Sequence, residues 1–313
     1  MRAFALDEFG TAGSVHDLPI PEPADGEVRI KVAAGGINPF DTVVLKGALK
    51  DRMQHDFPLI PCSDFAGTVD ALGSGVDGWK VGDQAFGQLG KMSFGHGSLA
   101  EFTTASPATI ALRPAAIDAQ FGAALPLAGV SAWMCIEPMG LKNGDVVVIL
   151  GAAGGIGGFA VQIAKHTGAH VVGVARGENT GYLRGLGADE VIDYTTKDVV
   201  ETVRKAHSAG IAGLVHTAGD AAVVVGLAGL VREGGHVASM RGGANIDELT
   251  KSKVVGINVQ TRVTTEALEK LAGMVEAGSL KRPEIKTYEL DQAEEAFEKI
   301  SSGHVRGKLV VIP

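Results

Sequence analysis

The chain has 313 residues, a formal net charge of −8, 45% hydrophobic and 20% charged residues, which fits a globular protein of two domains. The acidic balance gives no electrostatic support for a nucleic-acid partner, and two cysteines can form neither a disulfide scaffold nor a four-cysteine zinc site. No apolar run approaches the ~20 residues of a membrane span. The N-terminal residues lack the apolar core of a signal peptide. We therefore expect a cytoplasmic protein with no membrane partner.

The first third of the chain has the pattern of a compact, barrel-like β unit. VRIKVAAGGI (28–37) begins with alternating apolar and polar residues, and the short runs FAGTVDAL, DQAFG and SLAEFTT follow, bounded by glycine. Pro19, Pro21 and Pro23 stiffen the connection before the second strand.

Near Asp118 the pattern changes to alternating strands and helices. Short, mostly Val-rich strands are predicted at 146–150, 170–175, 190–194, 213–217, 235–240 and 254–260. Helices are predicted between them at 155–167, 180–185, 197–207 and 221–231. This alternation is typical of an α/β domain, a doubly wound parallel sheet with helices on both faces.

The tail of the chain is predicted to return to the first domain. It has the pattern of two helices and two strands, at 265–277, 291–301, 284–289 and 308–313. We place one domain at residues 1–118 and 266–313, and the other at residues 119–265.

A glycine-rich turn, GAAGGIG (151–157), follows the strand 146–150. The dinucleotide pattern G-x-G-x-x-G needs glycine at 152, where alanine stands. Gly154 still lets the backbone approach a pyrophosphate, and Gly157 lets the helix pack close to the strand. The free N–H groups at the helix start, at Gly155 and Ile156, then face the phosphates. A tight turn without a ligand is the alternative, but the position between strand and helix favours a dinucleotide.

The residue that ends the second strand of this domain indicates which dinucleotide. An acidic residue there would bind the ribose 2′-OH and favour NAD, whereas Arg176 can pair with a 2′-phosphate. Tyr194, which closes the third strand, is expected beside it. We therefore predict NADPH. The alternatives are a solvated Arg176 and Glu178 as a ribose acceptor.

Six segments carry a resemblance to a known family: INPFDTVVLKG, DFAGTV, LPLAGVSAW, GAAGGIGGFAVQIAK, LGADEVIDY and RGKLVVIP. In their order and spacing the chain resembles the zinc-independent, zeta-crystallin-like quinone oxidoreductases of the medium-chain dehydrogenase/reductase superfamily, over essentially its whole length. The resemblance implies a GroES-like β-barrel domain, a Rossmann domain with strand order 3-2-1-4-5-6, NADPH, and a cleft between the domains.

The resemblance also implies site residues. Zinc-dependent relatives carry cysteine and histidine at the positions of Asn38 and Ser63, so we expect no metal, and alcohol oxidation is disfavoured. Asn38 is implied to lie by the nicotinamide, where its amide can donate to the acceptor oxygen; otherwise it is a turn residue before Pro39. Ser131 is implied to bind the cofactor, or is an internal helix serine. Lys308 is implied to lie near the cofactor, or is a solvated strand lysine.

The segment after Asn38 departs from the family pattern. Many quinone reductases of this group have a tyrosine two residues after the aspartate, where this chain has Val43, so we expect solvent to supply the proton. Phe40, Phe65 and Trp133 are candidate pocket walls or core residues. Asp41 is expected to be structural and to hold the following helix or turn.

We predict an enzyme that transfers hydride from NADPH to a quinone or another electron-poor enone, without zinc. One alternative is an enoyl-thioester reductase, although no basic cluster indicates a site for a phosphopantetheine arm. The other alternative is an NADPH-binding structural or interaction protein without turnover. The apolar edge strand VVGINVQ predicts a homodimer.

Overall fold

The computed structural model describes residues 1–91 and 93–313, which form two compact units. Unit 1 contains Met1–Leu127, Val263–Ala277 and Glu284–Pro313, and unit 2 contains Ala128–Arg262 and Gly278–Pro283. The sequence places the first boundary after residue 118. In the structure, helix α2 (Ala119–Ala124) contacts the strands of unit 1, and the division falls after Leu127.

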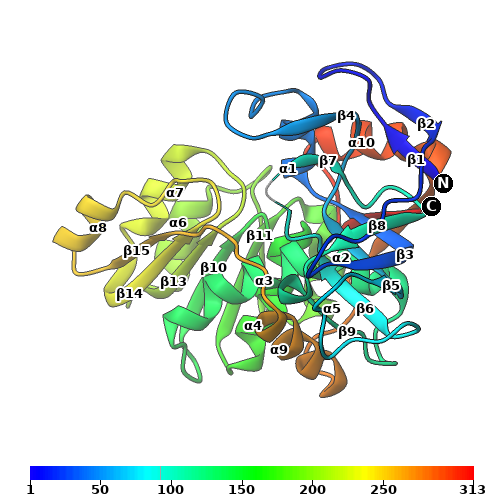
Figure 1. The fold of residues 1–313 in the computed structure, drawn as a ribbon. Coiled ribbons are helices and arrows are strands. Elements are labelled where there is room, and N and C mark those ends of the chain that lie inside the picture. The colour runs from blue at the N-terminus through cyan, green and yellow to red at the C-terminus, as the bar shows by residue number, and fades with distance from the viewer. Residues whose placement is uncertain (92) are drawn as a thin grey trace. The chain divides into compact units, whose positions relative to one another are not determined.

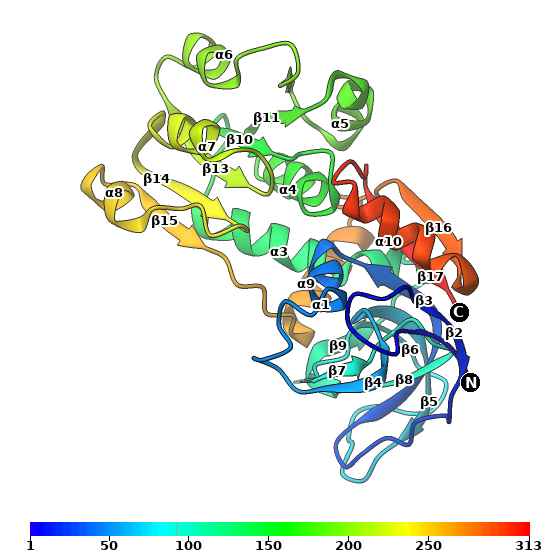
Figure 2. The same ribbon diagram turned by 90° about the horizontal axis from the view of Figure 1, so that it is seen from above.

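Unit 1 is built around a seven-stranded sheet with the order β16-β17-β3-β5-β6-β9, in which β8 also pairs with β3 (Figure 1). These strands are β3 (Val28–Ile37), β5 (Asp64–Leu72), β6 (Gln84–Gln88), β8 (Phe102–Ala105), β9 (Ile110–Leu112), β16 (Ile285–Glu289) and β17 (Lys308–Ile312). Because β17 pairs with β3, the tail returns to unit 1, and both chain termini lie side by side there (Figures 1 and 2).

Smaller elements surround this sheet. Two two-stranded sheets join β1 (Arg2–Ala5) with β2 (Ser14–Asp17), and β4 (His55–Ile60) with β7 (Phe94–His96). The other helices of the unit are α1 (Pro39–Leu45), α9 (Thr265–Glu276) and α10 (Ala293–Ser301), with short 3-10 turns η1 (Pro107–Thr109) and η4 (Leu290–Gln292). The amino-acid pattern predicts neither small sheet, because these strands lack a clear alternation of apolar and polar residues.

Unit 2 contains a six-stranded parallel sheet with the order β12-β11-β10-β13-β14-β15. In chain order this is 3-2-1-4-5-6, as predicted. The strands are β10 (Val146–Leu150), β11 (His170–Ala175), β12 (Glu190–Asp193), β13 (Ile211–His216), β14 (Val231–Ser239) and β15 (Val255–Asn258).

Helices cover both faces of this sheet, which explains why its strands are apolar on both sides. α4 contacts α5, and α6 contacts α7; Figure 1 shows α6 and α7 on one face and α4 on the other. The helices are α3 (Pro126–Ile136), α4 (Gly155–His166), α5 (Thr180–Leu186), α6 (Val199–Ala206), α7 (Ala221–Ala228) and α8 (Ile246–Lys251), with short 3-10 turns η2 (Glu137–Met139) and η3 (Gly177–Asn179). Within the described residues, no helix is both long enough and apolar enough to cross a membrane.

Candidate functional site

A buried polar cluster forms where three strands of unit 1 meet. β3 runs antiparallel to both β5 and β17, so its end lies beside the starts of the other two strands. The register pairs Gly36 with Asp64 and Ile37 with Leu309, the residue after Lys308. Asn38 follows directly as the N-cap of α1. Antiparallel pairing thus brings together Asn38, Asp64 and Lys308, which are far apart in the sequence.

Lys308 is buried, and its ammonium group is held by oxygen atoms of the neighbouring strand end. Nζ donates to the main-chain oxygen of Ile37 at 3.0 Å and to Oδ1 of Asn38 at 2.5 Å. Since an ammonium group only donates, the contact assigns the amide oxygen of Asn38 to the side that faces Lys308. The alternative of a solvated strand lysine is wrong. The predicted position of Lys308 near the cofactor remains a prediction.

Asp64 fixes the other side of the Asn38 amide. Its carboxylate accepts from Asn38 Nδ2 at 2.9 Å, from Gln88 Nε2 at 2.8 Å and from the N–H of Leu127 at 3.2 Å. Burial raises the pKa of Asp64, while the charge of Lys308 and these three donors oppose the rise. Three donors and a nearby cation favour the ionised carboxylate.

Asp41 is also buried in this cluster, but its carboxylate charge is less well stabilised by hydrogen-bond donors than that of Asp64. Its Oδ2 accepts from the N–H of Asn38 at 2.7 Å and so holds the start of α1, as predicted. The Asp41 carboxyl group also accepts from the Cys62 thiol. Burial, with help from the charge of Asp64, raises the pKa of Asp41 to about 7. Asp41 therefore takes up a proton near neutral pH.

The donor set around Asn38 does not fit a zinc ion. Zinc is held in proteins by thiolate, imidazole and carboxylate groups, whereas the Asn38 amide is already bonded to Lys308 and Asp64. A second cation would meet the ammonium charge at short range. Burial and the charge of Asp41 raise the pKa of the Cys62 thiol well above its ordinary value, so the thiolate that zinc needs is disfavoured.

The glycine turn of unit 2 has the geometry expected for a phosphate site. A Cβ at Gly157 would lie 2.2 Å from the oxygen of Gly151, so only glycine allows this close approach of helix and strand. At Gly154 the nearest such atom is 3.5 Å away, which leaves the backbone open to a ligand. The N–H groups of Gly155, Ile156 and Gly157 precede the first bond of α4, from Gly158 to Gly154, and the N-cap residue Gly154 has no side chain to cap them.

Arg176 and Tyr194 meet at the same edge of the sheet. They follow the adjacent strands β11 and β12, and Arg176 Nε donates to the Tyr194 hydroxyl at 3.1 Å. Glu178 lies on the short turn η3 and is exposed. Asp193, a second acidic group here, accepts from the N–H and hydroxyl of Thr195 at 3.0 and 2.7 Å. The cation and hydroxyl expected to hold a 2′-phosphate therefore lie side by side.

His216 and Ser239 are two residues of this edge that the sequence analysis missed. Ser239 Oγ accepts from the N–H groups of Arg241 and Gly243 at 3.1 and 2.9 Å, so its own hydrogen is left for His216 Nδ1 at 2.9 Å. Burial and the charge of Arg241 lower the pKa of His216, and the backbone of Gly219 opposes this shift.

The imidazole of His216 is therefore neutral and carries its proton on Nε2. That atom is buried and has no hydrogen-bond partner within residues 1–91 and 93–313. A polar residue at the carboxyl end of a buried parallel strand was the available signal, because ligands of such sheets bind at that edge.

The other predicted residues have varied surroundings. Ser131 is fully buried in α3, and its hydroxyl lies 2.6 Å from that of Thr261; its role toward the cofactor remains a prediction. Phe65 belongs to the core of unit 1. Phe40 and Val43 are 50% and 40% exposed on α1, where they are free to line a pocket.

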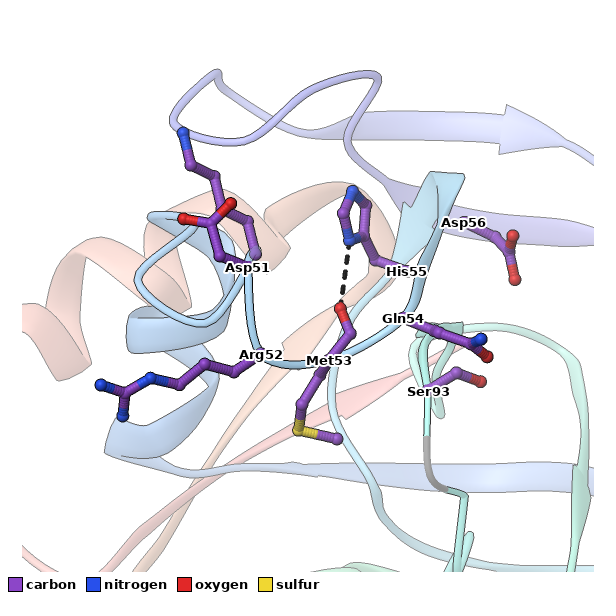
Figure 3. A pocket seen from close by; sticks show the side chains of 8 residues that line it. Asp51, Arg52, Met53, Gln54, His55, Asp56 and Ser93 are labelled. Carbon is purple, nitrogen blue, oxygen red and sulfur yellow. Dashed lines mark hydrogen bonds between the residues drawn. The ribbon is translucent and has the colours of Figure 1, made fainter.

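Unit 1 also has a hollow of about 710 Å³ beside the segment that follows α1 (Figure 3). Residues 50–56 and Ser93 line it, and His55 Nδ1 lies 3.3 Å from the main-chain oxygen of Met53. Its lining mixes both signs of charge and shares no residue with the Asn38 cluster.

Comparison with known proteins relates this chain to two family models and to proteins of similar length. The model described as "Alcohol dehydrogenase GroES-like domain" matches residues 24–115, and the one described as "Zinc-binding dehydrogenase" matches residues 186–311. The "Chloroplast envelope quinone oxidoreductase homolog" of Arabidopsis thaliana is 33% identical over 100% of this chain and 98% of the relative.

Two further proteins are similar over the whole chain. The "NADPH-dependent alkenal/one oxidoreductase, chloroplastic" of Arabidopsis thaliana is 29% identical, over 100% of this chain and 80% of the relative. The solved structure of the quinone oxidoreductase from Coxiella burnetii has a TM-score of 0.88 and 30% identity, and the match covers 100% of this chain and 99% of that one.

The raised pKa of Asp41 predicts a specific dependence of stability on pH. Between its ordinary value of 3.8 and about 7, the folded state keeps a proton that the unfolded chain releases, so the contribution of Asp41 to stability falls as pH rises. Asp41→Asn removes this titration and still accepts from the N–H of Asn38. Relative to the parent, the variant should gain on the order of a few kcal/mol between pH 5 and pH 8.

Urea unfolding at the two pH values measures this gain. Asp198→Asn, at the exposed N-cap of α6, is the matched control and should show no such gain. An equal response of the two variants would contradict the role given to the burial of Asp41.

Proposed function

The chain is an oxidoreductase of the quinone oxidoreductase family, in the medium-chain dehydrogenase/reductase superfamily, and on that premise we propose that it transfers hydride from NADPH to a quinone or another electron-poor enone. The names of the relatives, quinone oxidoreductase and alkenal/one oxidoreductase, support this acceptor class. The observation that carries the proposal is the Asn38 amide, held from both sides by Lys308 and Asp64.

In this mechanism Asn38 is the hydrogen-bond donor to the acceptor oxygen. Its Nδ2 group donates one hydrogen to Asp64 and has a second hydrogen that can be donated to the acceptor oxygen. As the acceptor is reduced, negative charge collects on its oxygen, and a donor fixed in advance stabilises that charge without having to reorient. NADPH supplies the hydride when it is bound. Solvent supplies the proton, in keeping with Val43 at the position where the family resemblance implies a tyrosine in many quinone reductases.

The preference for NADPH rests on Arg176 in this proposal. Its guanidinium and the Tyr194 hydroxyl can together hold a 2′-phosphate, while the carboxylate of Asp193 is bonded to Thr195. One relative is named as NADPH-dependent, which supports the same choice.

Arg176→Ala should remove most of the preference for NADPH over NADH, because a 2′-phosphate would lose its charged partner. We expect NADPH binding to weaken roughly tenfold or more, with little change for NADH. Fluorescence titration with both dinucleotides measures the two affinities. Arg204→Ala, on the exposed side of α6, is the matched control. Equal binding of NADH and NADPH by the parent protein would refute this role of Arg176.

His216→Leu should weaken dinucleotide binding, because the buried Nε2–H is a donor at the ligand edge of the sheet. Loss of one such hydrogen bond corresponds to a factor of about 5 to 100 in affinity. His236→Leu is the control. His236 lies in β14, where it pairs with Gly213 upstream of the strand end, and its Nδ1 is likewise buried without a partner among the described residues. If both substitutions have the same effect, His216 acts only through the fold.

Asn38→Ala should lower turnover more than it lowers NADPH affinity, since the amide acts on the developing charge. Loss of one oxyanion donor typically costs about 10²–10³ in rate, and we expect the low end or less because a quinone spreads its charge. NADPH oxidation is measured with quinones, short enones and an enoyl-CoA.

Asn245→Ala, which removes the N-cap of α8, is the matched control for loss of a capping asparagine. Parental turnover of Asn38→Ala with the best acceptor would exclude the proposed role. Binding of NADPH without turnover of any acceptor would contradict the proposed activity itself.

We also propose a homodimer that forms through β15. This strand ends the sheet of unit 2, and Val255 on it and Ile246 on the adjacent α8 are 46% and 48% exposed. Pairing with β15 of a second copy would cover both the apolar side chains and the open hydrogen-bonding edge. Light scattering at micromolar concentration should give the mass of two chains; a monomeric mass would contradict the proposal.

A further inference from the structure

Three potential metal ligands meet at the amino edge of the sheet of unit 2. His170 is the first residue of β11, and Glu190 is the first residue of β12. Glu190 pairs with Val172, and His170 precedes Val172 by two residues. Because side chains two apart on a strand share a face, His170 and Glu190 point to the same side of the sheet.

Helix α6 brings the third residue to this side. Val199 and Val203 of α6 belong to the same apolar cluster as Val172, so α6 covers the face on which His170 and Glu190 lie. His207 is the C-cap of α6, and its N–H donates to the main-chain oxygen of Val203 at 2.8 Å. The end of the helix thereby carries the His207 imidazole to the strand starts.

The distances among the three groups are those of a compact ligand set. The Nε2 atoms of His170 and His207 lie 2.6 and 3.3 Å from Oε1 of Glu190, and one ligand atom from each residue falls within 4.8 Å of the others. Zinc–ligand distances of about 2.0–2.2 Å imply about 3.3–3.6 Å between the ligands of a tetrahedral site. The His207–Glu190 distance already fits this value. The shorter His170–Glu190 distance is a hydrogen bond, which a metal would replace by moving the two groups about 0.7 Å apart.

Burial and bonding leave these atoms available to a cation. Nε2 of His207 is shielded from solvent and makes no hydrogen bond in the described part of the chain. The side chains of His170 and Glu190 are 36% and 38% exposed, so the fourth position of a tetrahedral site is open to water.

Two charged residues beside the cluster, Asp189 and Lys165, do not compete for the site. Asp189 is bonded through its two oxygens to Lys165 at 2.6 Å and to the N–H of Val171 at 2.8 Å, and so stays beside the cluster without being needed as a ligand. The ammonium group of Lys165 forms an ion pair with Asp189.

We propose that His170, Glu190 and His207 bind one divalent late first-row transition metal ion, of which Zn²⁺ is the representative. Two imidazoles and one carboxylate form a ligand set that suits zinc and its neighbours and disfavours Mg²⁺. The ion takes the place of the hydrogen between His170 Nε2 and Glu190, and the neutral ring that binds it carries its single proton on Nδ1. The site ties α6 to β11 and β12 at the edge opposite the glycine turn. It therefore stabilises unit 2 and takes no part in hydride transfer.

Equilibrium dialysis of the full-length, chelator-treated protein against Zn²⁺ tests the proposal. The parent and the control His166→Gln, at the exposed end of α4, should each bind one zinc per chain at micromolar free zinc. His170→Gln, His207→Gln and Glu190→Gln should each bind at least about tenfold more weakly, since even loss of a residue that only supports a ligand costs about 10- to 100-fold. Mg²⁺ should not compete.

Two further readouts keep the test decisive. Zinc should raise the thermal midpoint of the parent and of His166→Gln but not of the three ligand variants, because only the folded site binds it. NADPH oxidation without zinc should be the same in all five proteins, which shows that the variants fold. Absence of saturable binding by the parent would overturn the proposal. So would undiminished binding by the three variants, because the ion would then be held elsewhere.

Discussion

A buried ammonium group needs hydrogen-bond acceptors and a compensating negative charge. The residues around Lys308, at the centre of unit 1, must therefore supply both. Removing either charge of a buried pair leaves the other uncompensated, at a cost of about 3–5 kcal/mol, so such clusters persist only when every member is bonded. Lys308 binds the end of β3 through Ile37 and Asn38, and Asp64 binds the same amide from the start of β5. The network thus joins three strand ends and holds one amide in a single orientation.

In the sheet of unit 2, candidate functional side chains lie at the two opposite edges. Its strands are covered by helices on both faces, so their interiors are apolar and polar side chains occur at the strand ends. Arg176 and His216 follow or close strands at the carboxyl edge, whereas His170 and Glu190 open strands at the amino edge. A dinucleotide site and a metal site can therefore exist in one domain without sharing a residue.

Local patterns predict the elements of unit 2 well, because short Val-rich strands alternate with helices and a glycine turn marks the first crossover. The pairing of Arg176 with Tyr194 also follows from the sequence, since parallel strands place their ends at one edge. The contact between Lys308 and Asn38 does not follow from it, because the two residues are separated by most of the chain and meet only through strand pairing.

The sequence also does not predict the cluster of His170, Glu190 and His207, because these residues meet only in the folded chain. Its geometry depends on the register between β11 and β12 and on the residue at which α6 ends. No short sequence motif predicts either feature. The sequence pattern and the structure differ at the first boundary because α2 has the same helical pattern as the segment after it. Contacts of α2 with β3, β5, β6, β16 and β17 assign it to unit 1.

The Asn38 cluster also bears on which acceptors such a site can reduce. A divalent metal stabilises a full alkoxide charge, whereas a neutral amide contributes one hydrogen bond to the developing charge. Lys308 does not make up the difference, because its ammonium is bonded to the amide oxygen and its charge is balanced chiefly by Asp64. Its positive charge reaches an acceptor only by polarising the Asn38 amide, which makes the N–H a somewhat stronger donor. An acceptor that delocalises its own charge, as a quinone or an enone does, needs no more than that, whereas a simple ketone does. In the proposed role of Asn38, the clamped amide thus matches the site to acceptors that are already electron-poor.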